Sequence, residues 1–141
     1  MKALTIDRSE LLAGDALNIL TGGDGALHNR GFFCCLGLYL RELGVTPTQM
    51  GSWNYPSEVG LLDCGDELEW LAEAPKVPLP KAVNCTNRVE TAIAEINDSV
   101  MVPEERERLI AALFAQGGIE LTWTGDYEAG TARAYTVVGH E

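Results

Sequence analysis

The chain has 141 residues, of which 46% are hydrophobic and 22% are charged, and its formal net charge is −11. This length favours a single domain over residues 1–141, and the composition is that of a globular protein and excludes a largely disordered chain. The excess of acids argues against direct binding to nucleic-acid backbones, which requires clustered Lys and Arg.

The first half of the chain predicts a short strand, a hairpin and a central helix. Residues 3–6 form an apolar run typical of a strand. A glycine-rich segment in the middle of residues 17–29 favours turn conformations with positive φ, which predicts a hairpin there. Over residues 32–43 apolar side chains recur at steps of three and four, so we expect the central helix of the core, ended by Gly44.

The second half predicts two more helices and a second hairpin. A helix is expected over residues 87–97, and another over 103–117, where Pro103 suits the first helical position. Apolar and polar residues alternate from Ile119, which predicts a strand with a hairpin partner at residues 134–138. The expected fold is therefore α+β. It is a small antiparallel sheet (the N-terminal strand, the hairpin at 17–29 and the C-terminal hairpin 119–138) packed by helices 32–43, 87–97 and 103–117.

Negative charge is concentrated between residues 42 and 75, where seven acids occur without any Lys or Arg. Aromatic residues lie in the same stretch, and aromatic side chains bordered by charge are common in protein interfaces. The default interpretation is a solvated face that serves only solubility; the hypothesis that we carry forward is a surface that binds a host protein with a basic surface. The candidate partner-binding residues are Trp53, Tyr55, Glu58, Asp63, Asp66, Glu67 and Glu69.

The four cysteines and two histidines suggest two kinds of chemistry, a nucleophilic thiol and a zinc site. Cys34, near the start of the predicted central helix, is a candidate nucleophile with His28 or His140 as its base, and a pair of inert thiols at 34–35 is the favoured alternative. No Cys-x-x-Cys or His-x-x-x-His spacing supports a zinc site. We therefore expect a non-enzymatic protein with no catalytic residue, no metal and no cofactor.

The beginning of the chain does not have the apolar core of a secretory signal. The apolar run at residues 31–40 is too short to span a bilayer. These observations predict a cytoplasmic protein without a membrane partner, in which the cysteines stay reduced.

Six short segments stand out between residues 4 and 121. They are Leu4-Thr5-Ile6-Asp7-Arg8, Cys34-Cys35-Leu36-Gly37, Tyr55-Pro56-Ser57-Glu58, Ile96-Asn97-Asp98, Pro103-Glu104-Glu105-Arg106 and Gly118-Ile119-Glu120-Leu121. With these segments the chain resembles a family of small uncharacterised proteins of tailed bacteriophages and prophages, and residues 125–141 depart from it. The resemblance implies a phage-encoded accessory protein in the host cell, and it brings no activity and no catalytic residues.

Two functions follow as expectations. The first is a non-enzymatic phage accessory protein that binds and inhibits a host defence protein, such as a CRISPR effector, through the acidic surface. The alternative is an anti-defence protein that sequesters a small molecule or nucleotide. In that case the candidate anion contacts are Arg8, Arg30 and Arg133.

Overall fold

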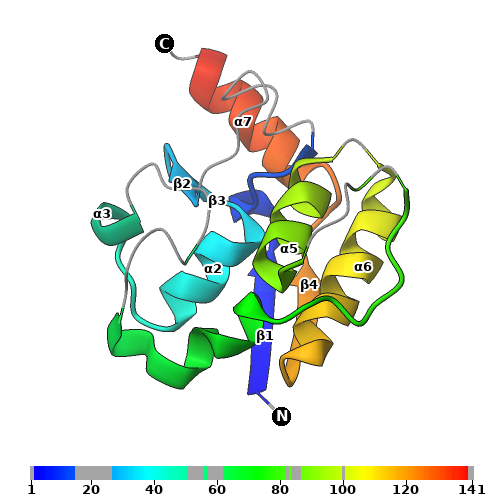
Figure 1. The fold of residues 1–141 in the computed structure, drawn as a ribbon. Helices are drawn as coiled ribbons and strands as arrows, with labels where there is room; N and C mark the ends of the chain where they lie inside the picture. Colours follow the sequence, from blue (N-terminus) through cyan, green and yellow to red (C-terminus); the bar gives the residue numbers. More distant parts are fainter. Residues whose placement is uncertain are drawn as a thin grey trace.

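Figure 1 shows the fold in a computed structural model, which describes residues 2–14, 27–50, 56, 62–81, 83, 87–99 and 101–139. These residues form helices and short strands. In chain order they are β1 (Lys2–Asp7), the 3₁₀ helix η1 (Arg8–Glu10), β2 (His28–Asn29), β3 (Phe32–Phe33), α2 (Cys35–Glu42), α3 (Pro47–Met50), the 3₁₀ helix η2 (Leu62–Ala72), α5 (Val89–Asp98), α6 (Pro103–Gln116), β4 (Ile119–Thr124) and α7 (Ala129–Gly139).

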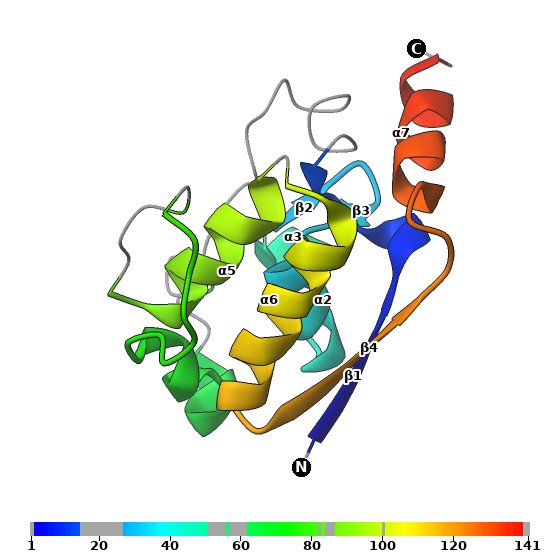
Figure 2. The ribbon, with the colours of Figure 1, turned by 90° about the vertical axis from the view of Figure 1, so that its right-hand side faces the viewer.

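Strands β1 and β4 form a two-stranded parallel sheet, although they come from opposite ends of the chain. Lys2 lies opposite Ile119 and Asp7 lies opposite Thr124, so the carboxyl ends of both strands meet at one edge of the molecule. Helix α6 precedes β4 and runs back alongside it, as a turned view shows (Figure 2). The parallel pairing therefore requires the whole of residues 8–118 to act as a crossover.

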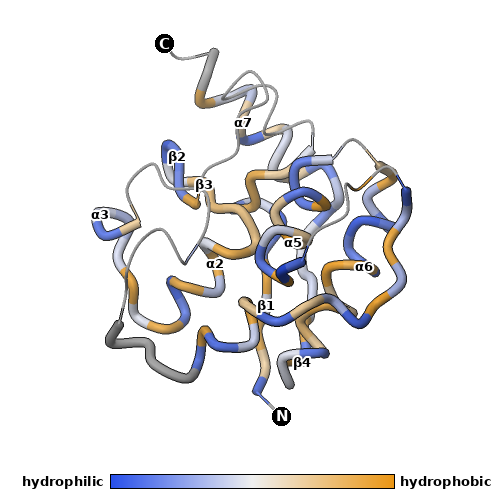
Figure 3. Tube along the Cα trace, viewed as in Figure 1, coloured by the Kyte–Doolittle hydropathy of each residue, from blue (hydrophilic) through white to orange (hydrophobic). Residues whose placement is uncertain are grey.

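Helices cover one face of this sheet and build the core. In β1, Leu4 and Ile6 are buried while their neighbours are exposed, which is the alternation of a strand with one covered face. Helices α2 and α6 pack on β1 and β4, and α5 packs on both helices. Figure 3 shows hydrophobic stretches in β1, α2 and α6. The α+β class predicted from the sequence is confirmed.

The central helix is shorter than the predicted 32–43. Phe32 and Phe33 belong to β3, which pairs antiparallel with β2. The helix starts only after Cys34, whose Sγ accepts the N–H of Gly37 at 3.4 Å. Every residue over 32–40 is buried, so the apolar spacing extends past the true beginning of the helix. Its predicted end is confirmed, since Gly44 has the positive φ of 95° that suits glycine.

The prediction of a C-terminal hairpin over residues 119–138 is wrong. Residues 119–124 do form a strand, but it pairs in parallel with β1, and residues 134–138 lie within helix α7. Gly130 and Ala134 are both buried and four residues apart, which places them on one helix face. A Cβ at residue 130 would lie 2.7 Å from the carbonyl oxygen of Arg8, so glycine lets α7 approach η1. Small residues at helical spacing thus outweigh the β-branched residues that suggested a strand.

The prediction of an antiparallel sheet is wrong for β1 and β4. The N-terminal strand pairs with the distant strand β4, and the two strands run parallel. The hairpin expected at 17–29 falls largely outside the described residues; its last two residues pair with β3. The other two helices are confirmed within two residues of their expected ends, at 89–98 and 103–116.

Candidate functional site

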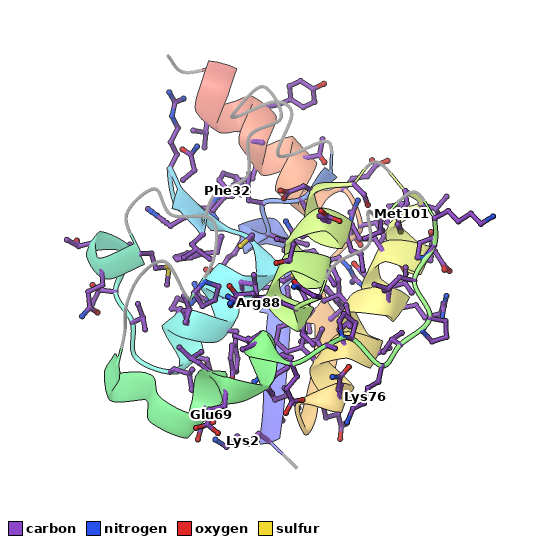
Figure 4. The ribbon with its side chains drawn as sticks, viewed as in Figure 1. Lys2, Phe32, Glu69, Lys76, Arg88 and Met101 are labelled. Atoms are coloured by element: carbon purple, nitrogen blue, oxygen red, sulfur yellow. The ribbon has the colours of Figure 1, made fainter. Side chains whose placement is uncertain are left out.

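Part of the predicted acidic surface lies outside the residues that the structure describes. This applies to Trp53, Tyr55 and Glu58, and to the side chains of Asp63 and Asp66 on η2. Glu69 is exposed, and it lies beside Lys2 in Figure 4.

Glu67 has two roles at this end of the molecule. Its carboxylate forms an ion pair with Lys2, and the two side chains are partly exposed to solvent. Its backbone carbonyl accepts hydrogen bonds from the Tyr39 hydroxyl at 2.6 Å and from the Trp70 indole at 3.0 Å. Trp70 is buried and packs against Phe114, with ring centroids 5.3 Å apart. The indole therefore anchors η2 to the core, while the carboxylates of Glu67 and Glu69 stay at the surface.

The structure does not bring the three predicted arginines together. Arg133 is exposed, donates to the carbonyl of Ser9 at 3.3 Å, and lies over the ring of Phe32. Arg30 is exposed in the turn between β2 and β3, with a φ of 51°. Arg8 follows β1 directly and is the member of this trio that lines a cavity.

The cavity has a volume of about 320 Å³ and lies at the carboxyl end of the parallel strands. Its walls come from η1 and the residues just after it, from the start of α6 with the preceding Met101, and from the segment that leads from β4 into α7. Figure 4 shows Met101 at the end of the molecule opposite Lys2 and Glu69. In open α/β sheets, ligands bind in a crevice outside the carboxyl ends of the strands, and this cavity has the corresponding position beside the two-stranded sheet. This cavity is the candidate functional site.

One wall of the cavity is an ion pair that is almost removed from solvent. The guanidinium of Arg8 donates to both carboxylate oxygens of Glu107, at 2.7 and 2.6 Å, and the side chains are 14% and 7% exposed. Arg8 also donates to the carbonyl of Gly125. Bonding to Glu107 raises the pKa of Arg8 above its ordinary value. Because this arginine is satisfied by its partner, it forms a rigid part of the wall.

Arg106, one residue earlier on α6, is in a different position. It is only 8% exposed, lines the same cavity, and makes one long hydrogen bond, from Nη1 to the carbonyl of Ser99 at 3.5 Å. The structure gives it no carboxylate partner among the described residues. Gly14 makes room for it, because a Cβ there would lie 2.5 Å from Nη1. Arg106 is therefore a largely buried cation whose remaining donors face the cavity.

Sequence reasoning missed Arg106, although a signal was present. The apolar stripe of helix 103–117 includes Ile110 and Leu113, which follow Arg106 by four and seven residues. An arginine on the apolar face of a helix is either paired or functional, because a buried charge without a partner is costly. Sequence reasoning also missed its neighbour Glu107.

The thiols at 34–35 are not placed for chemistry. Both are buried, and burial raises the pKa of Cys34 to about 12 and that of Cys35 well above its ordinary value. His28 packs on the ring of Phe33, and burial lowers its pKa. This agrees with the alternative of inert thiols. In the described part of the chain no group of three or more His, Cys, Asp or Glu could hold a metal ion.

No helix within the described ranges has the length and apolar character needed to cross a membrane. Comparison of the chain with protein-family models, with curated proteins and with solved structures finds no match. The case for a function therefore comes from the geometry of the cavity.

Proposed function

We propose that this protein is a non-enzymatic binding protein that sequesters a small anionic molecule in the cavity at the carboxyl end of β1 and β4. The observation that carries the proposal is the state of Arg106, a nearly buried guanidinium with a single long hydrogen bond. A charge removed from water loses its hydration and regains that free energy only from a counter-charge or hydrogen bonds. A phosphate or carboxylate in the cavity supplies both.

The neighbouring ion pair supports this role. Glu107 is fully engaged by Arg8, so its negative charge is compensated and does not occupy Arg106. A guanidinium presents a planar fork of donors that matches phosphate and carboxylate oxygens in pairs. Because the whole chain carries a net charge of −11, it repels anions at long range, and binding must rest on these short contacts.

Two matched substitutions on α6 test the proposal. Arg106→Gln removes the cavity cation, and Arg108→Gln removes an exposed cation that pairs only with Glu105 among the described residues. Molecules released by denaturing each purified protein are compared by mass spectrometry, and their affinities are measured by calorimetry. We expect an anionic molecule with the wild type and with Arg108→Gln, and its loss with Arg106→Gln. Equal binding to all three proteins would contradict an anion site at Arg106.

A second candidate function uses the opposite end of the molecule. The resemblance to phage proteins and the seven acids without a base over residues 42–75 favour an acidic face that binds and inhibits a basic host defence protein. The exposure of Glu42, Glu69 and Glu73 supports it. A pull-down from defence-competent cells, with Asp66, Glu67 and Glu69 all changed to Lys, tests it. We expect the triple variant to lose a partner that the wild type retains at low salt; retention of that partner would reject this face.

A further inference from the structure

The cavity is lined by exposed hydrophobic side chains as well as by charged ones. In the part of the chain that the structure describes, the exposed large hydrophobic side chains are Val102, Tyr127 and Tyr135. Val102 and Tyr127, which are 63% and 46% exposed, both line this cavity. They come from different segments, one before α6 and one before α7. Exposed hydrophobic groups that converge on one cavity mark a place where an apolar part of a ligand can be covered.

Tyr127 is held in place by the cavity's own ion pair. The guanidinium carbon of Arg8 lies 4.4 Å from the centre of the tyrosine ring, and Arg8 is fixed in turn by Glu107. The ring thus has a cation against one side and is still nearly half exposed. A ring that is positioned before the ligand arrives loses little conformational entropy on binding. This arrangement provides a stacking platform for a second planar ring.

We propose that the anion bound by this cavity belongs to the mononucleotide class, with its phosphate on Arg106 and its base stacked on Tyr127. This inference rests on the proposed function and names its ligand. The cavity volume of about 320 Å³ is at the lower end of the range for small-molecule sites, roughly 300–1,000 Å³. Thr131 and Glu128, which line the same cavity, supply hydrogen-bonding groups for the sugar hydroxyls.

Calorimetric titration of the full chain with three probes tests the assignment. The probes are adenosine 5′-monophosphate, ribose 5-phosphate, which lacks the base, and inorganic phosphate. Stacking of a base on an aromatic side chain makes the expected advantage of the nucleotide over ribose 5-phosphate roughly 5- to 100-fold in affinity. Tyr127→Ala should remove this advantage and leave the affinity for ribose 5-phosphate unchanged. Tyr127→Phe, which keeps the ring, and Tyr135→Ala, which removes an exposed tyrosine of α7 that does not line the cavity, should bind like the wild type.

The two levels of the proposal fail differently. If the nucleotide and ribose 5-phosphate bind equally well, or if Tyr127→Ala retains the full advantage, the base does not stack there and the mononucleotide assignment is overturned. The anion site itself then still stands, provided that Arg106→Gln weakens every probe. If Arg106→Gln changes no affinity, or if none of the probes binds, the sequestration of a phosphate-bearing molecule is overturned as well.

Discussion

Each end of the parallel strands holds an ion pair between a cationic side chain and a glutamate, in opposite surroundings. At the amino end, Lys2 pairs with Glu67, and the side chains are 60% and 38% exposed. At the carboxyl end, Arg8 pairs with Glu107, and both side chains are nearly buried. Water screens the first pair and competes for it, whereas the second is held by two hydrogen bonds without competition. The charges at the amino end are therefore exposed to solvent, whereas those at the carboxyl end hold the walls of the cavity together.

The largest expected effect comes from breaking the buried pair. Glu107→Ala leaves the partly buried guanidinium of Arg8 without its partner, and an unsatisfied charged donor of this kind costs about 1–3 kcal/mol. Unfolding in urea, followed by circular dichroism, measures this loss. Glu105→Ala, on the exposed side of the same helix, is the control and should leave the free energy of unfolding nearly unchanged. If the two substitutions have equal effects, the contrast between buried and exposed pairs is wrong.

Arg106 provides a second test of this contrast, because it lines the same cavity as Arg8 but has no carboxylate partner among the described residues. Replacing it with methionine keeps an apolar stem and removes a largely buried charge. In ligand-free protein, Arg106→Met should leave the free energy of unfolding unchanged or raise it by about 1 kcal/mol. Chemical denaturation after extensive dialysis measures the change. A loss similar to that of Glu107→Ala would mean that the charge of Arg106 is already compensated within the folded chain.

A carboxylate near the cavity should make the stability of the folded protein depend on pH. Burial raises the pKa of Asp98, which precedes the Ser99 carbonyl bonded by Arg106. The folded state therefore holds this proton more tightly than the unfolded state. The resulting stability is present below the unfolded pKa and is lost as the pH rises through the folded one.

Asp98→Asn should remove this pH-dependent loss of stability. The variant should therefore gain stability relative to the wild type as the pH rises from the unfolded to the folded pKa of Asp98, and it should keep that gain at neutral pH. Thermal melts at several pH values measure the difference between the two proteins. Asp7 is the matched contrast, because hydrogen bonds from Ser9 lower its pKa and give its contribution the opposite sign. A difference between wild type and variant that is the same at every pH would contradict a raised pKa for Asp98.

The sequence predicted those elements whose signals are local. Pro103 and a regular apolar stripe fixed the helix at 103–116, and alternation revealed the strand at 119–124. Alternation shows that a strand has two faces but does not show which strand lies beside it, so the pairing with β1 was missed. Helix α7 was missed because the contacts of Gly130 and Ala134 that favour it are made with η1, Leu12 and Phe32, far away in the chain.

The candidate site was only partly predictable for the same reason. Arg8 was named from its charge alone, and the fold places it on the cavity, while Arg30 and Arg133 lie elsewhere. The importance of Arg106 depends on its burial and on the absence of a carboxylate partner among the described residues, which no local pattern states. Tyr127 was missed because its role depends on the guanidinium of Arg8, more than a hundred residues earlier.

The smallest expected effect is at the exposed pair, and it tests whether the amino end holds its charges loosely. A double-mutant cycle with Lys2→Ala and Glu67→Ala should give a coupling free energy of about 0–1 kcal/mol that falls as salt is added, because solvent screens both groups. The backbone carbonyl of Glu67 keeps its hydrogen bonds from Tyr39 and Trp70 in these variants, so the packing of η2 should persist. Tryptophan fluorescence checks this point. A coupling of about 3 kcal/mol that resists salt would make the two ends alike, and it would leave the carboxylate of Glu67 committed to Lys2 and closed to a basic partner.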